Sequence, residues 1–418
     1  MAHPREVSPG LSSSDAAGVN RFRDHLGSML AMTARGVRPL GVIAATLLGC
    51  QALAASTAPQ SAVLALLPDQ VSGARSSFLK GFALGQASAR DCGVSPVRVD
   101  WRSLGADQDL VIRPGSQTAL LMAPFAADLR SFSRIAQERK LGVLLPYQRG
   151  DSLKSLAELD PEGRLHPLVP PLQVDLAQLA SDTLDQGWRR VMVVADPSDR
   201  SADQAQDYVE AFQGFGGRVE SFEAGLVQLV SANDQAALQQ LLEDVAIKGP
   251  DALVLAMAPD GDLASRLTSA QSQRATDFPS VARPWVWMLP AHRVHNLAPR
   301  PWNQLVLHQS AHGPGWSEFS KRFAARHDQA PDLVAASGFD SARLLTLASL
   351  APAPVSAEGT RDPLGWLDAD QEPTSLCDAV TARLDGRSVR LVGAASDLSR
   401  APGQPPSGAA STRLMPGR

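Results

Sequence analysis

Short aliphatic runs alternate with longer stretches of helical period along most of the chain. In the helical stretches, apolar positions recur at spacings of three and four, as at Leu129, Phe132 and Ala136. This alternation predicts an α/β protein with parallel sheets, and the strands divide into two sets of four. The eight predicted strands are 62–67, 97–101, 119–122, 142–145, 190–195, 218–222, 252–257 and 285–289.

The longest interval between strands separates the two sets. It contains the sequence His166-Pro-Leu-Val-Pro-Pro171, in which prolines fix the backbone and exclude a helix. We therefore interpret it as a crossover between two lobes. The next helix has Leu176, Leu179 and Thr183 on its apolar stripe, and Asp175 is placed as its N-cap.

The part after residue 302 is too short for a third α/β domain. A strand at 304–308, helices near 315–327, 332–350 and 374–384, and a short strand at 389–391 are predicted there. We expect them to complete the two lobes, so that the chain crosses between them more than once. The first lobe then comprises 60–170 plus about 303–355, and the second comprises 171–302 plus about 374–398. Residues 399–418 are rich in Pro, Gly and Ser and are expected to form a disordered tail.

Residues 1–55 have the features of a leader with an export signal. Arg35 and Arg38 precede an apolar run over 40–48, and small residues follow. The run is too short to span a bilayer, which needs about 20 residues, so a removable signal is expected. Met29 or Met32 is the expected true start.

Two cleavage reactions compete at the end of this signal. The sequence Leu47-Leu-Gly-Cys50 resembles the lipobox of bacterial lipoproteins, which implies lipidation of Cys50 as the only membrane contact. The sequence Ala52-Leu-Ala54 instead offers an ordinary cleavage site and simple secretion. A retained apolar segment is the third alternative.

Composition removes several classes of function. The 39 basic and 43 acidic residues give a net charge of −4, which offers no general hold on nucleic acid. The three Cys show no CxxC spacing, and His292 and His295 lack a third neighbouring ligand, so neither a metal nor a cofactor is expected. Besides Cys50, Cys92 and Cys377 either pair in an oxidising compartment or remain free thiols.

Three phrases, in consistent order, resemble a known family. They are the strand 62–68 with the Gly-bearing helix 78–85, the segment 187–196 followed by 208–217, and the helix pair 319–327 and 338–342 with its Gly-Phe-Asp phrase. Together they resemble the type 1 periplasmic binding proteins, in particular the Leu/Ile/Val-binding and amide-binding receptors of ABC transporters. The resemblance covers about 62 to 395. It implies two Rossmann-like lobes that are joined by a multi-strand hinge and close on a ligand.

In open α/β sheets, ligands bind beyond the carboxyl ends of the strands. The loops at those ends supply the candidate ligand-binding residues, which are Asp69, Gln70, Trp101, Phe125, Tyr147, Gln148, Arg149, Asp196, Ser198 and Asp260. Tyr147, Gln148 and Arg149 together could hold an anionic or planar ligand, or they form a solvated loop. Trp101 and Phe125 either wall the cleft or, as we favour, pack between helix and sheet.

The sequence departs from the amino-acid receptors of that family. The resemblance implies small hydroxyl residues after the third and fourth strands, but Pro124-Phe125 and Pro146-Tyr147 stand there. Each proline removes a backbone donor. A standard α-amino-acid ligand is therefore in doubt. Asp340, in the Gly-Phe-Asp phrase, is expected to have a structural role.

No catalytic constellation emerges from the sequence. Ser77-Phe-Leu-Lys80 matches the S-x-x-K pattern without its companion K-T-G and S-D-N motifs, and Gly214-Phe-Gly-Gly217 lacks the full dinucleotide fingerprint. We therefore expect no enzyme.

The leading hypothesis is an exported solute-binding receptor in the periplasm or cell envelope. Its expected partners are a small polar solute and the permease subunits of an ABC transporter. The alternative is a lipoprotein of the same fold that acts by protein contact, as activators of peptidoglycan synthases do.

Overall fold

The computed structural model describes residues 62–68, 72–104, 118–223, 225–277, 282–288, 297–351, 362–398 and 403–417. Thr57–Arg418 forms one compact unit, which is described here by itself. The predicted leader, Cys50, Asp69, Gln70 and the two histidines at 292 and 295 lie outside the described residues.

The first lobe is built on a five-stranded parallel sheet in the order β2-β1-β3-β4-β5. Its strands are β1 (Ala62–Pro68), β2 (Val99–Leu104), β3 (Thr118–Met122), β4 (Gly142–Leu145) and β5 (Leu165–Pro167). Each central strand is an aliphatic run because helices cover both faces of the sheet. The sequence predicted four of these strands, whereas the three-residue β5 lies in the predicted crossover.

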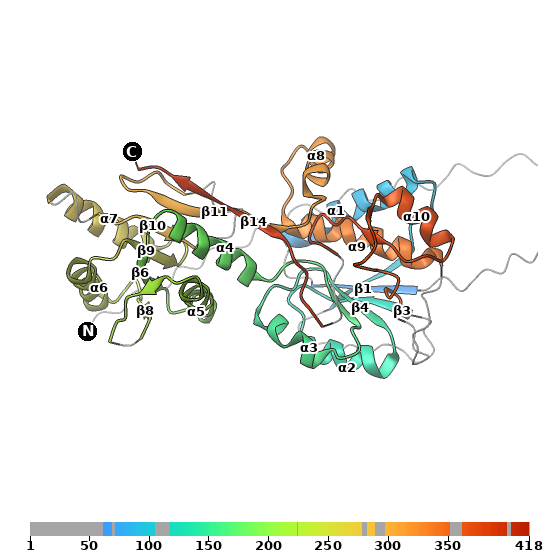
Figure 1. Ribbon diagram of the computed structural model, residues 1–418, viewed down its shortest axis with the longest axis horizontal. Helices are drawn as coiled ribbons and strands as arrows, with labels where there is room; N and C mark the ends of the chain where they lie inside the picture. Colours follow the sequence, from blue (N-terminus) through green and yellow to red (C-terminus); the bar gives the residue numbers. More distant parts are fainter. Residues whose placement is uncertain are drawn as a thin grey trace, which may run out of the picture. The chain divides into compact units, whose positions relative to one another are not determined.

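Two layers of helices cover this sheet (Figure 1). On one face lie α1 (Ser72–Asp91), α9 (Leu333–Leu350) and α10 (Leu376–Leu384). On the other lie α2 (Leu129–Arg139), the 3₁₀ helix η1 (Asp151–Ser155) and α3 (Leu156–Leu159). The short strands β12 (Pro373–Thr374) and β13 (Arg390–Leu391) pair beside α10.

The second lobe is built on a sheet in the order β14-β11-β10-β9-β6-β7, with β8 also paired to β6. Its strands are β6 (Arg190–Ala195), β7 (Arg218–Val219), β8 (Val227–Leu229), β9 (Ala252–Ala256), β10 (Trp285–Trp287), β11 (Gln304–His312) and β14 (Ala409–Met415). All pairs are parallel except β11 with β14.

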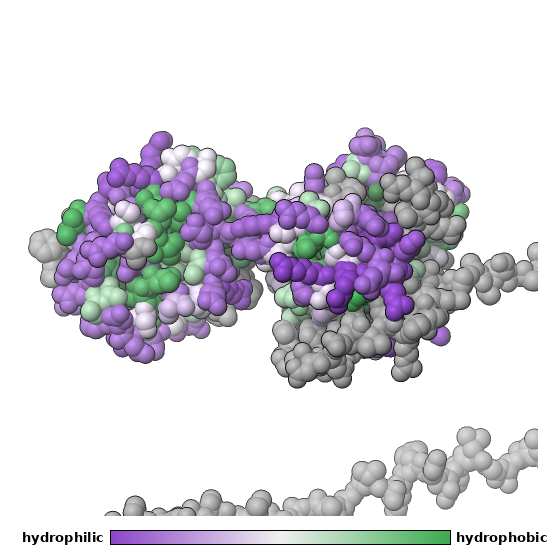
Figure 2. Space-filling view, turned by 90° about the horizontal axis from the view of Figure 1, so that it is seen from below, coloured by the Kyte–Doolittle hydropathy of each residue, from purple (hydrophilic) through white to green (hydrophobic). Residues whose placement is uncertain are grey.

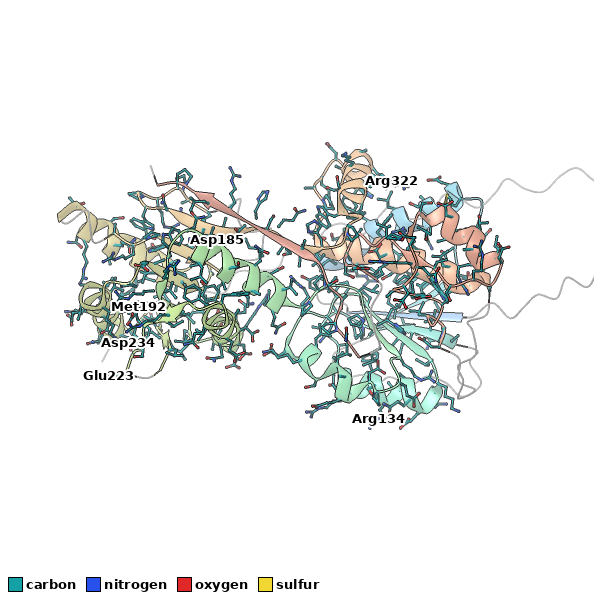
Figure 3. The ribbon with its side chains drawn as sticks, viewed as in Figure 1. Arg134, Asp185, Met192, Glu223, Asp234 and Arg322 are labelled. Atoms are coloured by element: carbon teal, nitrogen blue, oxygen red, sulfur yellow. A yellow bond between two sulfur atoms is a disulfide. The ribbon has the colours of Figure 1, made fainter. Side chains whose placement is uncertain are left out.

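Alternate residues of β6 face the two helix layers of this lobe. Val191 and Val193 pack with α4 (Leu172–Asp185) and α5 (Asp199–Gly214). Met192, labelled in Figure 3, packs on the opposite face with α6 (Gln235–Lys248) and α7 (Asp262–Asp277). Polar residues cover most of the face seen in Figure 2, and apolar residues gather between α6 and α5. The two-lobed α/β class with parallel sheets that the sequence predicted is confirmed.

Three parts of the predicted organisation differ from the structure. Strand β11, assigned to the first lobe, pairs with β10 of the second because both are apolar central strands. Helix α10 and β13, assigned to the second lobe, pack into the core of the first. Residues 409–415, expected to be disordered, form β14 along β11. The tail lacks apolar periodicity because an edge strand is stabilised by backbone hydrogen bonds and needs few buried side chains.

Helix α9 is the central helix of the first lobe. It is long and apolar enough to cross a membrane, yet 83% of it is buried inside the protein. It lies against α1 at a very close approach: a Cβ added at Gly81 would stand 1.8 Å from the Ala335 carbonyl oxygen. Gly338 in turn meets the Phe78 carbonyl, where a Cβ would stand 2.2 Å away. Only glycine allows these backbones to approach so closely.

Buried polar groups and a disulfide fix the helices around α9. Asp340 accepts hydrogen bonds from the backbone N–H groups of Ala394 and Ala395, both at 2.7 Å, and pairs with Arg343 at 3.0 Å. Burial raises the pKa of the Asp340 carboxyl. A disulfide joins Cys92, just beyond α1, to Cys377 in α10. The pairing alternative for these two cysteines is therefore the one present.

Candidate functional site

A cavity of about 580 Å³ lies between the two lobes, within the size range of small-molecule sites. The first lobe contributes the loops that follow β3 and β4, and the second contributes α4, α5 and the carboxyl side of β10 and β11. The lining residues are Ala126, Tyr147, Arg149, Gly150, Asp151, Leu172, Gln173, Asp175, Leu176, Leu179, Arg200, Asp203, Gln204, Asp207, Met288 and Leu307.

Arg149 and Asp175 form a buried ion pair on the cavity wall. The Arg149 Nη2 donates to Asp175 Oδ2 at 2.8 Å, and its Nε donates to the Pro170 carbonyl at 2.8 Å. The second oxygen of Asp175 accepts the Ala311 N–H of β11 at 2.6 Å. The side chains are 13% and 1% exposed, so both charges are largely removed from water. This guanidinium is therefore neutralised by the protein itself.

A second polar network joins the lobes across the same cavity. Lys154 of η1 donates to Asp207 Oδ1 of α5 at 2.6 Å. The Gln173 amide donates to Asp207 Oδ2 at 2.9 Å and to Asp151 Oδ1 at 2.6 Å. Burial raises the pKa of the Asp207 carboxyl, although the bond from Lys154 acts in the opposite direction. The bond to Asp207 raises the pKa of Lys154. The network therefore links first-lobe and second-lobe side chains directly.

The floor of the cavity is apolar. One face of α4 supplies three leucines, at spacings of three and four residues. Met288, just after β10, and Leu307 of β11 complete it, and both are buried. A ligand in this cavity therefore meets hydrocarbon on one side and polar groups at the lobe boundary. The three leucines are Leu172, Leu176 and Leu179.

Of the eight candidate residues inside the described ranges, Tyr147 and Arg149 line this cavity. Gln148, between them, is 5% exposed and is not on the wall. Its Nε2 donates to Ser152 Oγ at 2.7 Å, whereas its Oε1 has no hydrogen-bond partner among the described residues. The loop after β4 is thus half in the cavity and half in the protein interior.

Trp101 and Phe125 pack against helix α1, as the favoured interpretation holds. Both rings meet the Phe78 ring edge to face, with centroid distances of 6.5 and 5.5 Å. Phe125 also contacts the Tyr147 ring, at 6.1 Å. Trp101 lies on the edge strand β2 and is 38% exposed. Neither residue lines the cavity between the lobes.

The second-lobe candidates stand outside the cavity wall. Ser198 is the N-cap of α5, and its side chain accepts the Ser201 N–H. Asp196 accepts from Ser198 Oγ at 2.5 Å and from Ser201 Oγ at 3.0 Å. Asp260 lies in the exposed turn between β9 and α7. Asp196 and Ser198 thus shape the start of α5, and α5 residues one and two turns further on reach the cavity.

The cavity residues of α4 were missed because of where this helix begins. The sequence predicts Asp175 as an N-cap, but α4 starts at Leu172 directly after Pro171, so Asp175 is buried in the first helical turn. A signal for a buried acid was present in the sequence, because Asp175 stands inside the apolar stripe of this helix. A second signal, for the cavity residues of α5, was the set of charged residues Arg200, Asp203 and Asp207 at helical spacing.

The other cavities and side-chain clusters are weaker candidates for the functional site. A cavity of about 770 Å³ lies between α8 (Trp316–His327) and the strands β11 and β14. The space between the lobes is the stronger candidate, because it is lined by both lobes and by two of the predicted loop residues. Within the described ranges, no group of three His, Cys, Asp or Glu side chains is placed to hold a metal ion.

No family model and no curated protein matches the sequence. Solved structures do match it over most of their length. A putative branched-chain amino acid ABC transporter protein from Rhodospirillum rubrum is 16% identical with a TM-score of 0.57, over 84% of this chain and 96% of that one. A branched-chain amino acid ABC transporter periplasmic ligand-binding protein from Burkholderia xenovorans is 13% identical with a TM-score of 0.54, over 85% and 90%.

A third similar structure is an ABC transporter substrate-binding protein from Desulfitobacterium hafniense, in complex with Leu. It is 14% identical with a TM-score of 0.52, over 85% of this chain and 97% of that one. The strand order of the two lobes and these similarities agree. The chain has the two-lobed fold of the type 1 periplasmic binding proteins of ABC transporters.

Proposed function

We propose that this protein is an exported solute-binding receptor that holds a small polar ligand between its lobes for an ABC-type transporter. The observation that carries the proposal is the cavity of about 580 Å³ lined by loops and helices of both lobes. Solved proteins of the same fold include one from Desulfitobacterium hafniense in complex with Leu and one from R. palustris in complex with benzoate.

The mechanism that we propose is ligand-stabilised closure of the lobes. Ligand contacts with both lobes favour the closed arrangement by the difference in affinity between the two states. Tyr147 of the first lobe, with Gln173 and Asp203 of the second, is placed to supply such contacts. The permease subunits would then recognise the closed receptor in the periplasm or cell envelope, with Cys50 as the lipid anchor.

The site does not favour an α-amino-acid carboxylate. Pro124 and Pro146 remove backbone donors at the loops where amino-acid receptors hold that group. Arg149, the buried guanidinium on the wall, is already paired with Asp175. A ligand carboxylate would have to compete with a buried protein carboxylate for it.

The second candidate function is that of a lipoprotein of this fold that acts by protein contact. The specific observation in its favour is the Lys154–Asp207 pair, which joins side chains of the two lobes directly. A protein whose lobes are joined by its own side chains would not need a solute to fix their arrangement. Affinity purification from solubilised envelope separates the two: recovery of permease subunits supports the receptor, and recovery of cell-wall enzymes alone supports the lipoprotein.

The receptor itself is tested by thermal unfolding against a library of amino acids, amides, amines, aromatic acids and nucleobases. A ligand present at 100 times its Kd stabilises the folded state by about 2.7 kcal/mol, which shifts the midpoint by several degrees. At least one compound should raise the melting temperature in a concentration-dependent way. If no compound does so, the receptor proposal fails.

A further inference from the structure

A basic groove of about 550 Å³ lies on the first lobe, between the first turns of α1 and the end of α8. It shares no lining residue with the cavity between the lobes. Among its lining residues, all of which the structure describes, three are Arg or Lys, one is His, and none is Asp or Glu. The three cations are Arg75 and Lys80 of α1 and Arg326 of α8.

The cations at the start of α1 run against the usual preference of helix ends. The amino end of a helix carries a partial positive charge, so acidic residues stabilise the first turn. The first turn of α1 has no acid and contains Arg75, and Lys80 follows little more than one turn later. Arg326 lies in the last turn of α8, where a cation is favourable. Helix stability therefore accounts for the cation on α8 but not for those on α1.

The protein does not neutralise this groove. Lys80 donates to the uncharged Gln329 side chain at 2.9 Å. In the part of the chain that the structure describes, neither Lys80 nor Arg326 takes part in an ion pair. The two acids that follow α8 in the sequence are Asp328, which is exposed, and Asp332, which caps α9, and neither lines the groove.

His327 lies where the charges of the two helices combine. Burial lowers the pKa of its imidazole, and the charges of Lys80 and Arg326 lower that pKa further, against a hydrogen bond with the Lys80 backbone that raises it. Its Nε2 atom is buried and has no hydrogen-bond partner among the described residues. An anion in the groove would offset both charges and would accept a hydrogen bond from this atom when the ring is protonated.

We propose that this groove binds a phosphate group, carried either by a soluble phosphate ester or by a phospholipid headgroup. A phosphate offers several oxygen acceptors, and Arg and Lys are the side chains that bind it in proteins. The Ser76 hydroxyl on the wall adds an uncharged donor. Leu79 lies between the cations and is 37% exposed, so it offers hydrocarbon to the rest of the ligand. The site is independent of the receptor function proposed above.

Two pairs of probes test the phosphate and its source with the purified full-length protein. Glycerol 3-phosphate and glycerol are titrated by isothermal calorimetry, and glycerol should not bind. Vesicles of phosphatidylglycerol mixed with phosphatidylcholine are compared with vesicles of phosphatidylcholine alone by co-sedimentation. The second vesicle controls for binding through the apolar run at 40–48. We expect at least one of the anionic probes to bind at least about 10-fold tighter than its uncharged or zwitterionic partner, and added salt to weaken that binding.

Two double variants with the same change of charge locate the site. Lys80→Gln with Arg326→Gln removes two cations of the groove. Arg130→Gln with Arg134→Gln removes two exposed cations of α2, which covers the other face of the same sheet (Figure 3). The groove variant should weaken binding of the anionic probe about 30-fold, at about 5-fold for each cation, and the α2 variant less than about 2-fold. Arg326→Gln alone, on an exposed side chain, should give the 5-fold loss if the double variant is unstable.

The outcomes separate the two sources and the failure of the proposal. Binding of glycerol 3-phosphate without vesicle binding supports a soluble phosphate ester, and binding of the anionic vesicles alone supports a lipid headgroup. If neither anionic probe binds more tightly than its partner, the groove is no phosphate site. Equal losses in the groove and α2 variants also overturn the proposal, because overall charge then explains the binding.

Discussion

At the scale of single residues, the buried Arg149–Asp175 pair determines what the cavity can hold. Sequence reasoning identified Arg149 from its place after a predicted strand, but it assigned Asp175 to a helix cap. The pairing could not be predicted, because it depends on how the crossover brings α4 back to the loop after β4. The same holds for Tyr147, whose ring is shared between the cavity and the aromatic contact with Phe125.

Replacing Asp175 with Asn should destabilise the protein strongly. The amide can still accept the Ala311 N–H, but the Arg149 charge is left buried without its partner. We expect a loss of about 3 kcal/mol in the free energy of unfolding, measured by urea denaturation. Asp185→Asn, an exposed change on the same helix, should stay within about 0.5 kcal/mol of the wild type. Equal stabilities of the two variants would show that the pair contributes nothing.

At the scale of elements, the late helices were predicted closely, because their apolar stripes and caps are local features. Asp332 caps α9, and Ser375 caps α10. Strands β5, β8 and β14 were not predicted, since each is short or lies at an edge and has little apolar pattern of its own. The backbone partners of such strands are set by the rest of the sheet, which local sequence does not show.

Close packing of α1 and α9 gives a sharp test at Gly81. A methyl group there would stand 1.8 Å from the Ala335 carbonyl oxygen, so Gly81→Ala must force the helices apart. We expect a loss of about 3 kcal/mol or more in the free energy of unfolding. Gly73→Ala, in the first turn of the same helix, meets nothing within 4 Å and should be neutral or slightly stabilising. The packing account fails if both variants are equally stable.

The N-cap of α2 provides a test that depends on pH. Asp128 accepts from Ser131 Oγ at 2.6 Å and from two backbone N–H groups, and the bond from the Ser131 side chain is the main cause of its lowered pKa. Asp128→Ala should cost about 1 kcal/mol at neutral pH. Because the folded pKa is below the unfolded value of 3.8, this stabilisation is full above 3.8 and is lost as the pH falls through the folded pKa.

Urea denaturation at neutral and acid pH measures that difference. The difference in the free energy of unfolding between wild type and Asp128→Ala should become smaller as the pH falls. Arg134→Ala, an exposed change on the same helix (Figure 3), should show no comparable gap at either pH. If the stability difference between wild type and Asp128→Ala is independent of pH, the ionised carboxylate has no role in capping.

At the scale of the whole molecule, the number of lobes was predictable and the path of the chain between them was not. The alternation of strands and helices was enough to show two sheets. The return of β11 to the second sheet, and of α10 to the first lobe, depends on which apolar faces remain uncovered after the early elements have packed. The location of the cavity follows from that path, since residues of both lobes line it.

The Lys154–Asp207 pair should hold the lobes together in the absence of ligand. A double-mutant cycle with Lys154→Met and Asp207→Asn should give a coupling of about 1 kcal/mol, because Lys154 is 48% exposed and water weakens the pair. Small-angle X-ray scattering should show a larger radius of gyration for Lys154→Met than for the wild type. Arg134→Met, an exposed change in the same lobe, is the control.

The effect on scattering should also depend on pH. Burial raises the folded pKa of Asp207 above its ordinary value of 3.8, so its carboxylate is protonated at a higher pH than in the unfolded chain. The pair is then lost, and the difference between wild type and Lys154→Met should disappear as the pH falls through that raised pKa. A difference that persists in acid would mean that another contact holds the lobes.

Native mass spectrometry of the protein purified from its own cell envelope tests the central claim most directly. The account predicts a stoichiometric small molecule that is released when the protein is denatured. A bare protein that instead co-purifies only with cell-wall enzymes would contradict the receptor function.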